Sequence, residues 1–346
     1  DRGATWDTIG PDLTRQIAID PAYRISDYGT LLWIDESPRK QGLLAVGTDD
    51  GLVQISETAG VSWRRIDRLP GVPEHAQIRR ATFSAHDDRT IYVAASAHED
   101  DDFRPYLLKS TDLGETWTSI AGNLPTRSPI LSFVEDPVNP RLLFAGGEFG
   151  IHATLDGGSR WFPLQLNLPT SAIHDMLIHP RAHDLVVGTH GRGLWILDSI
   201  VGLRGLTPDV LAATGAIFTP RPALLLTRFD RGRSSLGSAY YTAPNPPDGA
   251  YLDVYVKPGA ADSASVEVFD ANGRRLRRFE LQQPAGLTRV VWDLRADPPP
   301  AATPSAGRGR GGSPRPLVSP GSYEARLSVG SETFRTAVIV LPDPGK

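Results

Sequence analysis

The stretch Ser110-Thr111-Asp112-Leu113-Gly114-Glu115-Thr116-Trp117 decides the fold of this chain, because its pattern recurs. The pattern Ser/Thr-x-Asp-x-Gly-x-x-Trp returns in full at Thr154–Trp161 and, with Thr58 in place of the aspartate, at Ser56–Trp63. The first six residues match the end of a further copy, which closes on Trp6. A repeat at a regular interval sets the architecture, since each copy belongs to one structural unit.

The spacing of the repeat predicts a β-propeller. Its tryptophans lie 57, 54 and 44 residues apart. Repeats of roughly 40–50 residues are typical of propeller blades, each a four-stranded sheet. Within the motif the aspartate accepts hydrogen bonds from its own turn, the glycine adopts a positive φ, and the tryptophan packs between blades. A structural role is therefore predicted for Ser110, Asp112, Gly114, Trp117, Thr154, Asp156, Gly158 and Trp161.

This motif resembles the Asp-box, or BNR repeat, of the sialidase and sortilin-like superfamily and of exported bacterial glycosyl hydrolase-like proteins. The resemblance covers about residues 1–200 and implies an all-β chain that begins with part of a multi-bladed propeller. In those families the box is a structural turn. The resemblance further implies a secreted, periplasmic or cell-surface bacterial protein with a glycan, peptide or protein ligand.

Composition narrows the class of protein. A chain of 346 residues with 40% hydrophobic residues is long enough for about two domains. A net charge of −4 gives no signal for nucleic-acid binding, and no apolar run approaches the ~18 residues of a membrane span. The chain has no cysteine, so disulfide and thiolate chemistry are excluded, while 30 prolines and 34 glycines suit a turn-rich β protein.

Short apolar runs bounded by Gly, Pro or Asp predict three full blades, in the ranges 30–68, 78–120 and 128–166. A last blade begins near residue 172 but then loses its motif. We therefore expect a C-terminal fragment of a larger propeller, whose missing blades lie upstream in the same or another chain. Residues 201–245 are predicted to close the ring and to link to the next domain.

Residues 246–346 are predicted to form a β-sandwich, because about seven short strands follow one another with turn signals such as Asn272-Gly273. Trp292-Asp293-Leu294-Arg295 and Pro320-Gly321-x-Tyr323 resemble the Ig-like domains that end exported bacterial proteins and flagellar hook-capping proteins. The Pro/Gly/Arg-rich tract at 297–318 is predicted to be a flexible loop.

The face opposite the motif turns is the predicted site. In a four-stranded meander the turn between strands two and three lies at the other end from the turn between three and four, which carries the motif. The Ser96–Arg104 loop on that face is long and rich in charge, and long loops on rigid scaffolds often carry function. The catalytic candidates are Asp101, Asp102, Glu148 and His190, and the binding candidates are Tyr28, Asp49, Asp50, His98, Glu99, Arg104 and Arg192.

Three functions follow as alternatives. The first is a module that binds a glycan, a peptide or a protein. The second is a glycoside hydrolase, in which two carboxylates ~5–10 Å apart act on a glycosidic bond. The third is a structural subunit of a larger assembly. No cofactor is required, although Asp100, Asp101 and Asp102 offer oxygen ligands that suit Ca²⁺.

Overall fold

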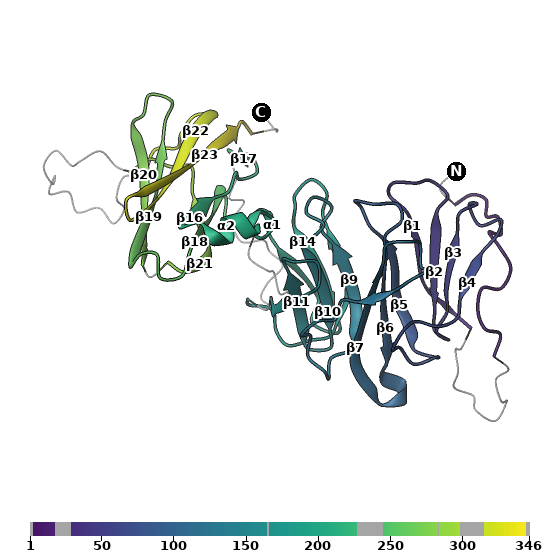
Figure 1. Cartoon of the computed structure of the whole chain (residues 1–346). Helices are drawn as coiled ribbons and strands as arrows, with labels where there is room; N and C mark the ends of the chain where they lie inside the picture. Colours follow the sequence, from purple (N-terminus) through teal and green to yellow (C-terminus); the bar gives the residue numbers. More distant parts are fainter. Residues whose placement is uncertain are drawn as a thin grey trace, which may run out of the picture. The chain divides into compact units, whose positions relative to one another are not determined.

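The chain divides into two compact units, Asp1–Leu197 and Asp198–Lys346. The structure is a computed structural model that describes residues 3–17, 29–164, 166–226, 245–282, 284–297 and 315–343. Within that part, every sheet of the first unit is antiparallel and its strands follow one another in chain order (Figure 1). No helix there is long and apolar enough to cross a membrane.

The described part of the first unit contains four such sheets, which form four successive blades. Their first strands pack against one another in sequence, β1 on β5, β5 on β9 and β9 on β13, as the innermost strands of a propeller do. The strands are β1 (Leu31–Glu36), β2 (Leu44–Thr48), β3 (Val53–Ser56) and β4 (Arg64–Ile66); β5 (Gln77–Phe83), β6 (Ile91–Ala97), β7 (Asp102–Ser110) and β8 (Thr118–Ser119); β9 (Ile130–Glu135), β10 (Leu143–Gly147), β11 (Gly150–Thr154) and β12 (Trp161–Pro163); and β13 (Ile173–Ile178), β14 (Leu185–Thr189) and β15 (Leu194–Leu197).

The sequence motif forms the turn between the third and fourth strands, and we call these the repeat turns. In the second blade the Ser110 hydroxyl donates to Asp112 at 2.7 Å and accepts from the Gly114 amide at 2.7 Å. Asp112 also accepts from the hydroxyl and the amide of Thr116, and these bonds lower its pKa to about 2. Gly114 has a φ of +84°, which favours glycine. These hydrogen bonds close the turn between β7 and β8.

The tryptophans of two repeat turns also bond the backbone that follows the preceding repeat turn. The indole N–H of Trp161 donates to the Ile120 carbonyl at 2.8 Å, and that of Trp63 donates to the Ile9 carbonyl at 3.1 Å. The Asn123 amide brackets Trp161, donating to its carbonyl at 2.9 Å and accepting from its N–H at 2.6 Å. Each of these isoleucines lies three positions after the tryptophan of its own repeat, and it contacts the tryptophan of the next repeat. The two residue types therefore recur together because they form one interblade contact.

The first repeat turn offers a stability prediction. Thr58 stands where the other turns have aspartate; its hydroxyl accepts from the Ser62 amide at 2.9 Å and lies 2.9 Å from the Ser62 hydroxyl. We expect Thr58→Asp to stabilise the chain by about 0.5–1 kcal/mol at pH 7, because a carboxylate makes charge-assisted bonds to the turn. Thermal unfolding at pH 7 and below the pKa of about 2 that Asp112 has in the equivalent turn measures the effect. The gain must vanish on acidification, since the stability from a depressed carboxyl pKa is lost as pH falls through it. A gain that persists in acid would contradict this mechanism.

The second unit is a β-sandwich of two sheets, ordered β16-β18-β21 and β17-β23-β22-β19-β20. Their inner faces share one apolar core around the fully buried Trp292. The strands are β16 (Gly215–Ile217), β17 (Ala223–Leu224), β18 (Ala250–Val256), β19 (Ser263–Phe269), β20 (Arg275–Gln282), β21 (Gly286–Trp292), β22 (Gly321–Val329) and β23 (Glu332–Leu341), preceded by helices α1 (Val201–Gly205) and α2 (Pro208–Ala212).

The segment expected to close the propeller instead joins this sandwich. β16 pairs with β18, and β17 pairs with β23 in parallel. The N–H of Gly202 donates to Asp253, which fixes α1 on the same unit. The segment belongs to the sandwich because β16 and β17 pair with the edges of its two sheets. Residues 298–314, most of the loop predicted to be flexible, lie outside the described residues.

Candidate functional site

A β-bulge lies at the same place in each of the four innermost strands. The pairing of β5 with β6 skips Arg79, and that of β13 with β14 skips His174. The pairings of β1 with β2 and of β9 with β10 skip Leu32 and Leu131 at the corresponding position. A bulge bends the strand and redirects a side chain, and bulges are frequent beside active sites. All four bulges lie near the end of the blades opposite the repeat turns.

Two of these bulged residues belong to a charged cluster that spans three blades. The His174 ring stacks on His190, from the β14–β15 turn, with ring centroids 5.1 Å apart. Burial, reinforced by the positive charges of Arg79 and His190, lowers the pKa of His174, and Glu148 opposes that shift. Glu148 lies in the β10–β11 turn. Arg79 comes from the second blade, Glu148 from the third, and the histidines from the fourth. We call these four residues the rim cluster.

The residues that follow three of the bulges form a second network, which we call the axial network. The Arg80 guanidinium lies over the Trp33 ring, 3.6 Å from its centroid, and forms an ion pair with Asp175. Arg80 is buried, whereas the Asp175 side chain is 64% exposed. The Nε–H groups of Arg80 and Trp33 are buried and hydrogen-bond to nothing that the structure describes. These two donors are available to a bound water or to a ligand oxygen.

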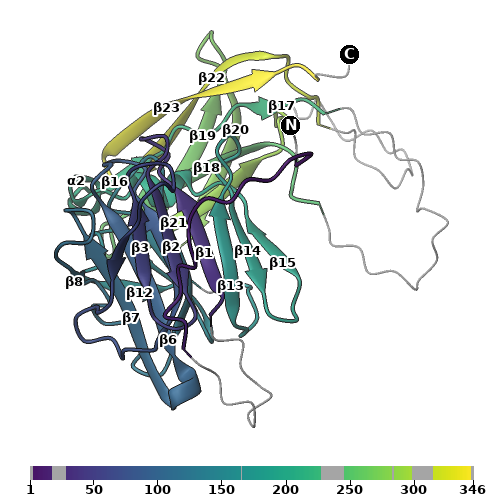
Figure 2. The ribbon, with the colours of Figure 1, turned by 90° about the vertical axis from the view of Figure 1, so that its right-hand side faces the viewer.

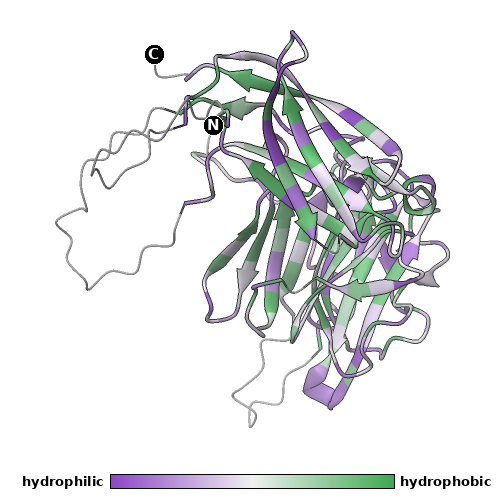
Figure 3. Cartoon of the chain, turned by 90° about the vertical axis from the view of Figure 1, so that its left-hand side faces the viewer, coloured by the Kyte–Doolittle hydropathy of each residue, from purple (hydrophilic) through white to green (hydrophobic). Residues whose placement is uncertain are grey.

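The longest turn on this face is the β6–β7 hairpin, with a 3₁₀ turn, His98–Asp100, at its tip. The tip is strongly hydrophilic (Figure 3). Glu99 accepts from the Gln77 amide at 2.7 Å, and Nδ1 of His98 is 2.9 Å from the Ser96 hydroxyl. Asp101 ends the 3₁₀ turn in the left-handed conformation with a φ of 59°. Glu99, His98 and Asp101 are exposed and accessible to a ligand.

Asp102 and Arg104 are paired with each other. The Arg104 guanidinium donates to both oxygens of Asp102, and the Tyr106 hydroxyl donates to Asp102 at 2.6 Å. The Arg104 bonds hold the pKa of Asp102 well below its usual range. A carboxyl held so acidic is a poor proton donor near neutral pH. Of the two predicted carboxylates in this hairpin, Asp101 is therefore the better catalytic candidate.

Two predicted binding residues are structural instead. Asp49 is 7% exposed and accepts from the amides of Gly29 and Thr30 at 2.9 and 3.0 Å. Asp50 is fully buried and accepts from the Thr48 hydroxyl and the Arg15 amide. The prediction of a binding role for them is wrong because both carboxylates satisfy buried backbone donors. Arg192 is exposed in the β14–β15 turn, and Tyr28 lies outside the described residues.

The predicted Ca²⁺ site is not formed. Among the residues that the structure describes, no group of three or more His, Asp or Glu side chains could hold a metal ion. Asp102 turns to Arg104 and Tyr106, and Asp101 caps the 3₁₀ turn, so the successive carboxylates do not converge.

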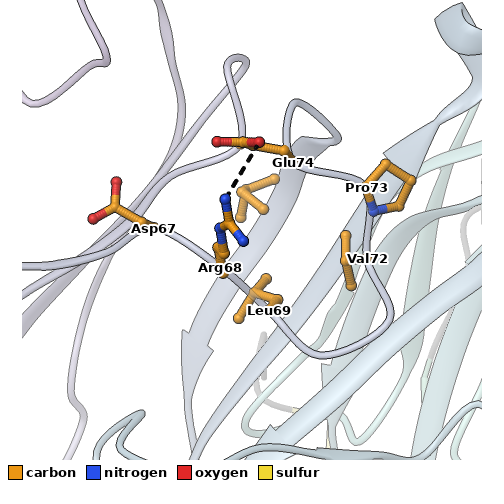
Figure 4. A pocket seen from close by; sticks show the side chains of 8 residues that line it. Asp67, Arg68, Leu69, Val72, Pro73 and Glu74 are labelled. Carbon is orange, nitrogen blue, oxygen red and sulfur yellow. Dashed lines mark ion pairs between the residues drawn. The ribbon is translucent and has the colours of Figure 1, made fainter.

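A separate pocket of about 180 Å³ lies between the first two blades (Figure 4). It is bounded by the segment Asp67–Glu74, which connects β4 to β5, and by Gly51 and Ile78. Arg68 and Glu74 form an ion pair across it at 3.9 Å. None of the predicted site residues lines this pocket.

Sequence reasoning missed the axial network of Trp33, Arg80 and Asp175. One signal was present: the pair Arg79-Arg80 stands in the middle of the inner strand β5. Successive side chains of a regular strand point to opposite faces, so two adjacent arginines suggest a bulge or a buried charge.

The comparisons with known proteins give likenesses only in structure. No family model matches the chain, and no curated protein matches it. It is similar to the GH74 xyloglucanase of Xanthomonas campestris, with 13% identity, a TM-score of 0.39 and coverage of 77% of this chain and 39% of that one. The chain is also similar to the GH74 enzyme of Niastella koreensis, with 15% identity, a TM-score of 0.37 and coverage of 75% of this chain and 31% of that one.

A third similar structure is YCF48 bound to D1 peptide, with 14% identity, a TM-score of 0.34 and coverage of 49% of this chain and 55% of that one. The chain spans less than two thirds of each of these proteins. The TM-scores and sequence identities are too low for the activity of any of these proteins to be assigned to this chain.

Proposed function

We propose that the first unit binds a glycan on the rim opposite the repeat turns, and that the protein is exported and acts outside the bacterial cytoplasm. The observation that carries the proposal is the rim cluster, because three blades contribute Arg79, Glu148, His174 and His190 to one place. Fixed donors and acceptors of both charges on a rigid scaffold suit a ligand with many hydroxyl groups.

Exposed aromatic rings on the same rim support a glycan. Phe149 is 57% exposed beside Glu148, and Phe103 is 38% exposed in the β6–β7 hairpin. The Arg127 guanidinium lies 6.0 Å from the Phe103 ring centroid. Because Arg127 lies just before β9, this contact brings the β6–β7 hairpin close to the start of β9. An aromatic ring offers a flat apolar surface to a sugar ring while neighbouring polar groups bond its hydroxyls. Exported location is inferred from the sequence resemblance alone.

Binding to a panel of immobilised glycans and extended peptides tests the proposal. We expect the chain to bind a glycan, and we expect Glu148→Gln and His174→Ala each to weaken that binding at least about tenfold. Arg160→Ala is the matched control, because Arg160 is an exposed residue of a repeat turn at the opposite end of the blades. Binding to peptides alone, or equal loss with Arg160→Ala, would overturn the glycan proposal.

Glycoside hydrolysis is the second candidate function, since the same rim carries the exposed carboxylates Glu99, Asp101 and Glu148. An acid–base pair separated by ~5–10 Å is what the reaction needs. Turnover of aryl glycosides that falls with both Asp101→Asn and Glu148→Gln would favour the enzyme over the binding module. Glycan binding without turnover would favour the module.

A further inference from the structure

The connection between the first two blades is longer than the two connections that follow it. Each of the three contains Leu-Pro and ends at the isoleucine that precedes a bulge. Leucine and isoleucine lie nine positions apart in the first connection, six in the second and five in the third, the pairs being Leu69 and Ile78, Leu124 and Ile130, and Leu168 and Ile173. The longer connection includes Val72, Pro73 and Glu74, which line the pocket in Figure 4. The added length of chain therefore forms one wall of this pocket.

Two hydrogen-bonded turns fix the shape of that wall. The N–H of Val72 donates to the Leu69 carbonyl at 3.2 Å, and Gly71, which follows a proline, has a φ of +75°. A proline followed by a glycine at positive φ is the sequence of a type II turn. The N–H of Ala76 closes a second turn on the Pro73 carbonyl at 3.2 Å. A wall built from two closed turns is already ordered, so a ligand binds without the entropy cost of ordering it.

Arg15 and Gly51 hold this wall against the first blade, whose strands β1, β2 and β3 lie side by side in Figure 2. The Arg15 guanidinium donates to the Asp50 carbonyl, in the β2–β3 turn, at 2.8 Å. It also donates to the carbonyls of Asp67 and Glu74, at 2.7 and 3.3 Å. Gly51 has a φ of +88°, and a Cβ there would lie 2.2 Å from the Glu74 carbonyl oxygen. The glycine therefore permits the close approach that closes this side of the pocket.

The pocket has an apolar floor and a polar mouth. Leu69 and Ile78 are buried in its floor, and Val72 is half-buried beside them. At the mouth the Arg68 side chain is 82% exposed. The Glu74 carboxylate lies 3.6 and 3.9 Å from the two guanidinium groups that flank it. Both distances are longer than a hydrogen bond, so its oxygens can accept from a ligand hydroxyl.

One sugar ring suits the size and the lining of this pocket. An apolar cavity of about 150 Å³ takes a benzene ring, and this pocket of about 180 Å³ has room for one six-membered ring. The floor suits the C–H face of a sugar, while Arg68 donates to its hydroxyls and Glu74 accepts from them. Asp67 and Glu74 are balanced in charge by the two arginines beside them, which favours a neutral sugar over a charged one.

The pocket adjoins the rim cluster. Ile78 lines the pocket, and the bulged Arg79 of the rim cluster follows it directly. On the other side of Ile78, the Gln77 side chain donates to Glu99 at 2.7 Å and accepts from Arg79 at 3.3 Å. The first three residues of β5 therefore connect the β6–β7 hairpin, the pocket and the rim cluster.

We propose that this pocket is a subsite that takes one neutral sugar unit, at the end of a chain or of a branch, while the rim cluster binds the units that follow. The subsite deepens the glycan binding proposed above and rests on it. Because the pocket has room for one ring, the chain ends there or carries that ring as a branch.

Methyl NMR of the intact chain tests the subsite with monosaccharides as probes. Glucose, galactose, mannose, xylose and N-acetylglucosamine are each added at up to about 50 mM. At least one is expected to shift the methyl resonances of Leu69 and Ile78, with a Kd on the order of 1–10 mM for a ligand of this size. Val72→Phe fills the pocket and is expected to weaken this binding at least about tenfold. Val138→Phe is the matched control, because Val138 is 58% exposed in the β9–β10 turn, at the end of the blades that carries the repeat turns.

Glu74→Gln tests the polar mouth without filling the pocket. It keeps the shape of the side chain and removes the charge, so the sugar is expected to bind about tenfold more weakly. Glu57→Gln is its control. The Glu57 side chain is 51% exposed and also forms an ion pair, with Lys40, but it lies in a repeat turn.

Failure of the subsite differs from failure of glycan binding on the rim. A polymeric glycan that His174→Ala weakens, with no monosaccharide shifting Leu69 or Ile78, would overturn the subsite and keep the rim site. Equal effects of Val72→Phe and Val138→Phe, or entry of only glucuronate, glucosamine or phenol, would overturn it as well. Monosaccharides that enter the pocket while no polymeric glycan binds would keep the pocket as a sugar site and overturn the rim site.

Discussion

Trp161→Ala is expected to lower the free energy of unfolding of the first unit by about 3–5 kcal/mol, the usual cost of removing a large buried aromatic side chain. The ring is 3% exposed between the second and third blades. Its loss opens a cavity and removes the indole bond to the Ile120 carbonyl. Urea unfolding followed by circular dichroism measures the change as a lower midpoint at a similar slope.

Trp6→Ala is the matched control for that prediction, since the two residues hold the same motif position. Trp6 is exposed, so Trp6→Ala is expected to change the free energy of unfolding by less than about 0.5 kcal/mol, as substitutions of exposed side chains usually do. Equal losses from both variants would show that the interblade site contributes little and that the repeat turn itself carries the tryptophan's effect.

The repeat made the blades predictable because its chemistry is local. The blade predicted over residues 128–166 contains β9 to β12, which run from Ile130 to Pro163. A hydroxyl, a carboxylate, a glycine and a tryptophan within eight residues determine one turn, and that turn fixes the register of the strands on either side.

The site was less predictable because its contacts join residues far apart in the sequence. Arg80 and Asp175 pair across 95 positions, and no local pattern reports such a contact. Burial could not be predicted from the local sequence either. Asp49 and Asp50 have the sequence of an exposed polar turn, yet both accept hydrogen bonds from backbone or hydroxyl donors inside the blade. Topology alone places His190, Glu148 and His98 at the end of the blades opposite the repeat turns, but it does not indicate which charges meet.

Asp175→Asn is expected to destabilise the first unit by about 2–3 kcal/mol, because it leaves the Arg80 guanidinium buried without its counter-charge. Breaking a buried ion pair from one side typically costs 3–5 kcal/mol. We expect less here, since the Asp175 side chain is 64% exposed and water already screens it. Thermal or urea unfolding at pH 7 measures the effect.

Removing the buried charge as well should restore much of that stability. In Arg80→Met/Asp175→Asn an unbranched apolar side chain replaces the guanidinium over the Trp33 ring, so no uncompensated charge remains. The double variant is therefore expected to be more stable than Asp175→Asn alone, although the nearby Asp35 carboxyl loses its interaction with Arg80 in it. Additive losses would instead mean that the ion pair contributes little and that Arg80 acts through its packing on Trp33. In that case the axial network would be an apolar support for the rim cluster, and its charge would be irrelevant to the stability of the unit.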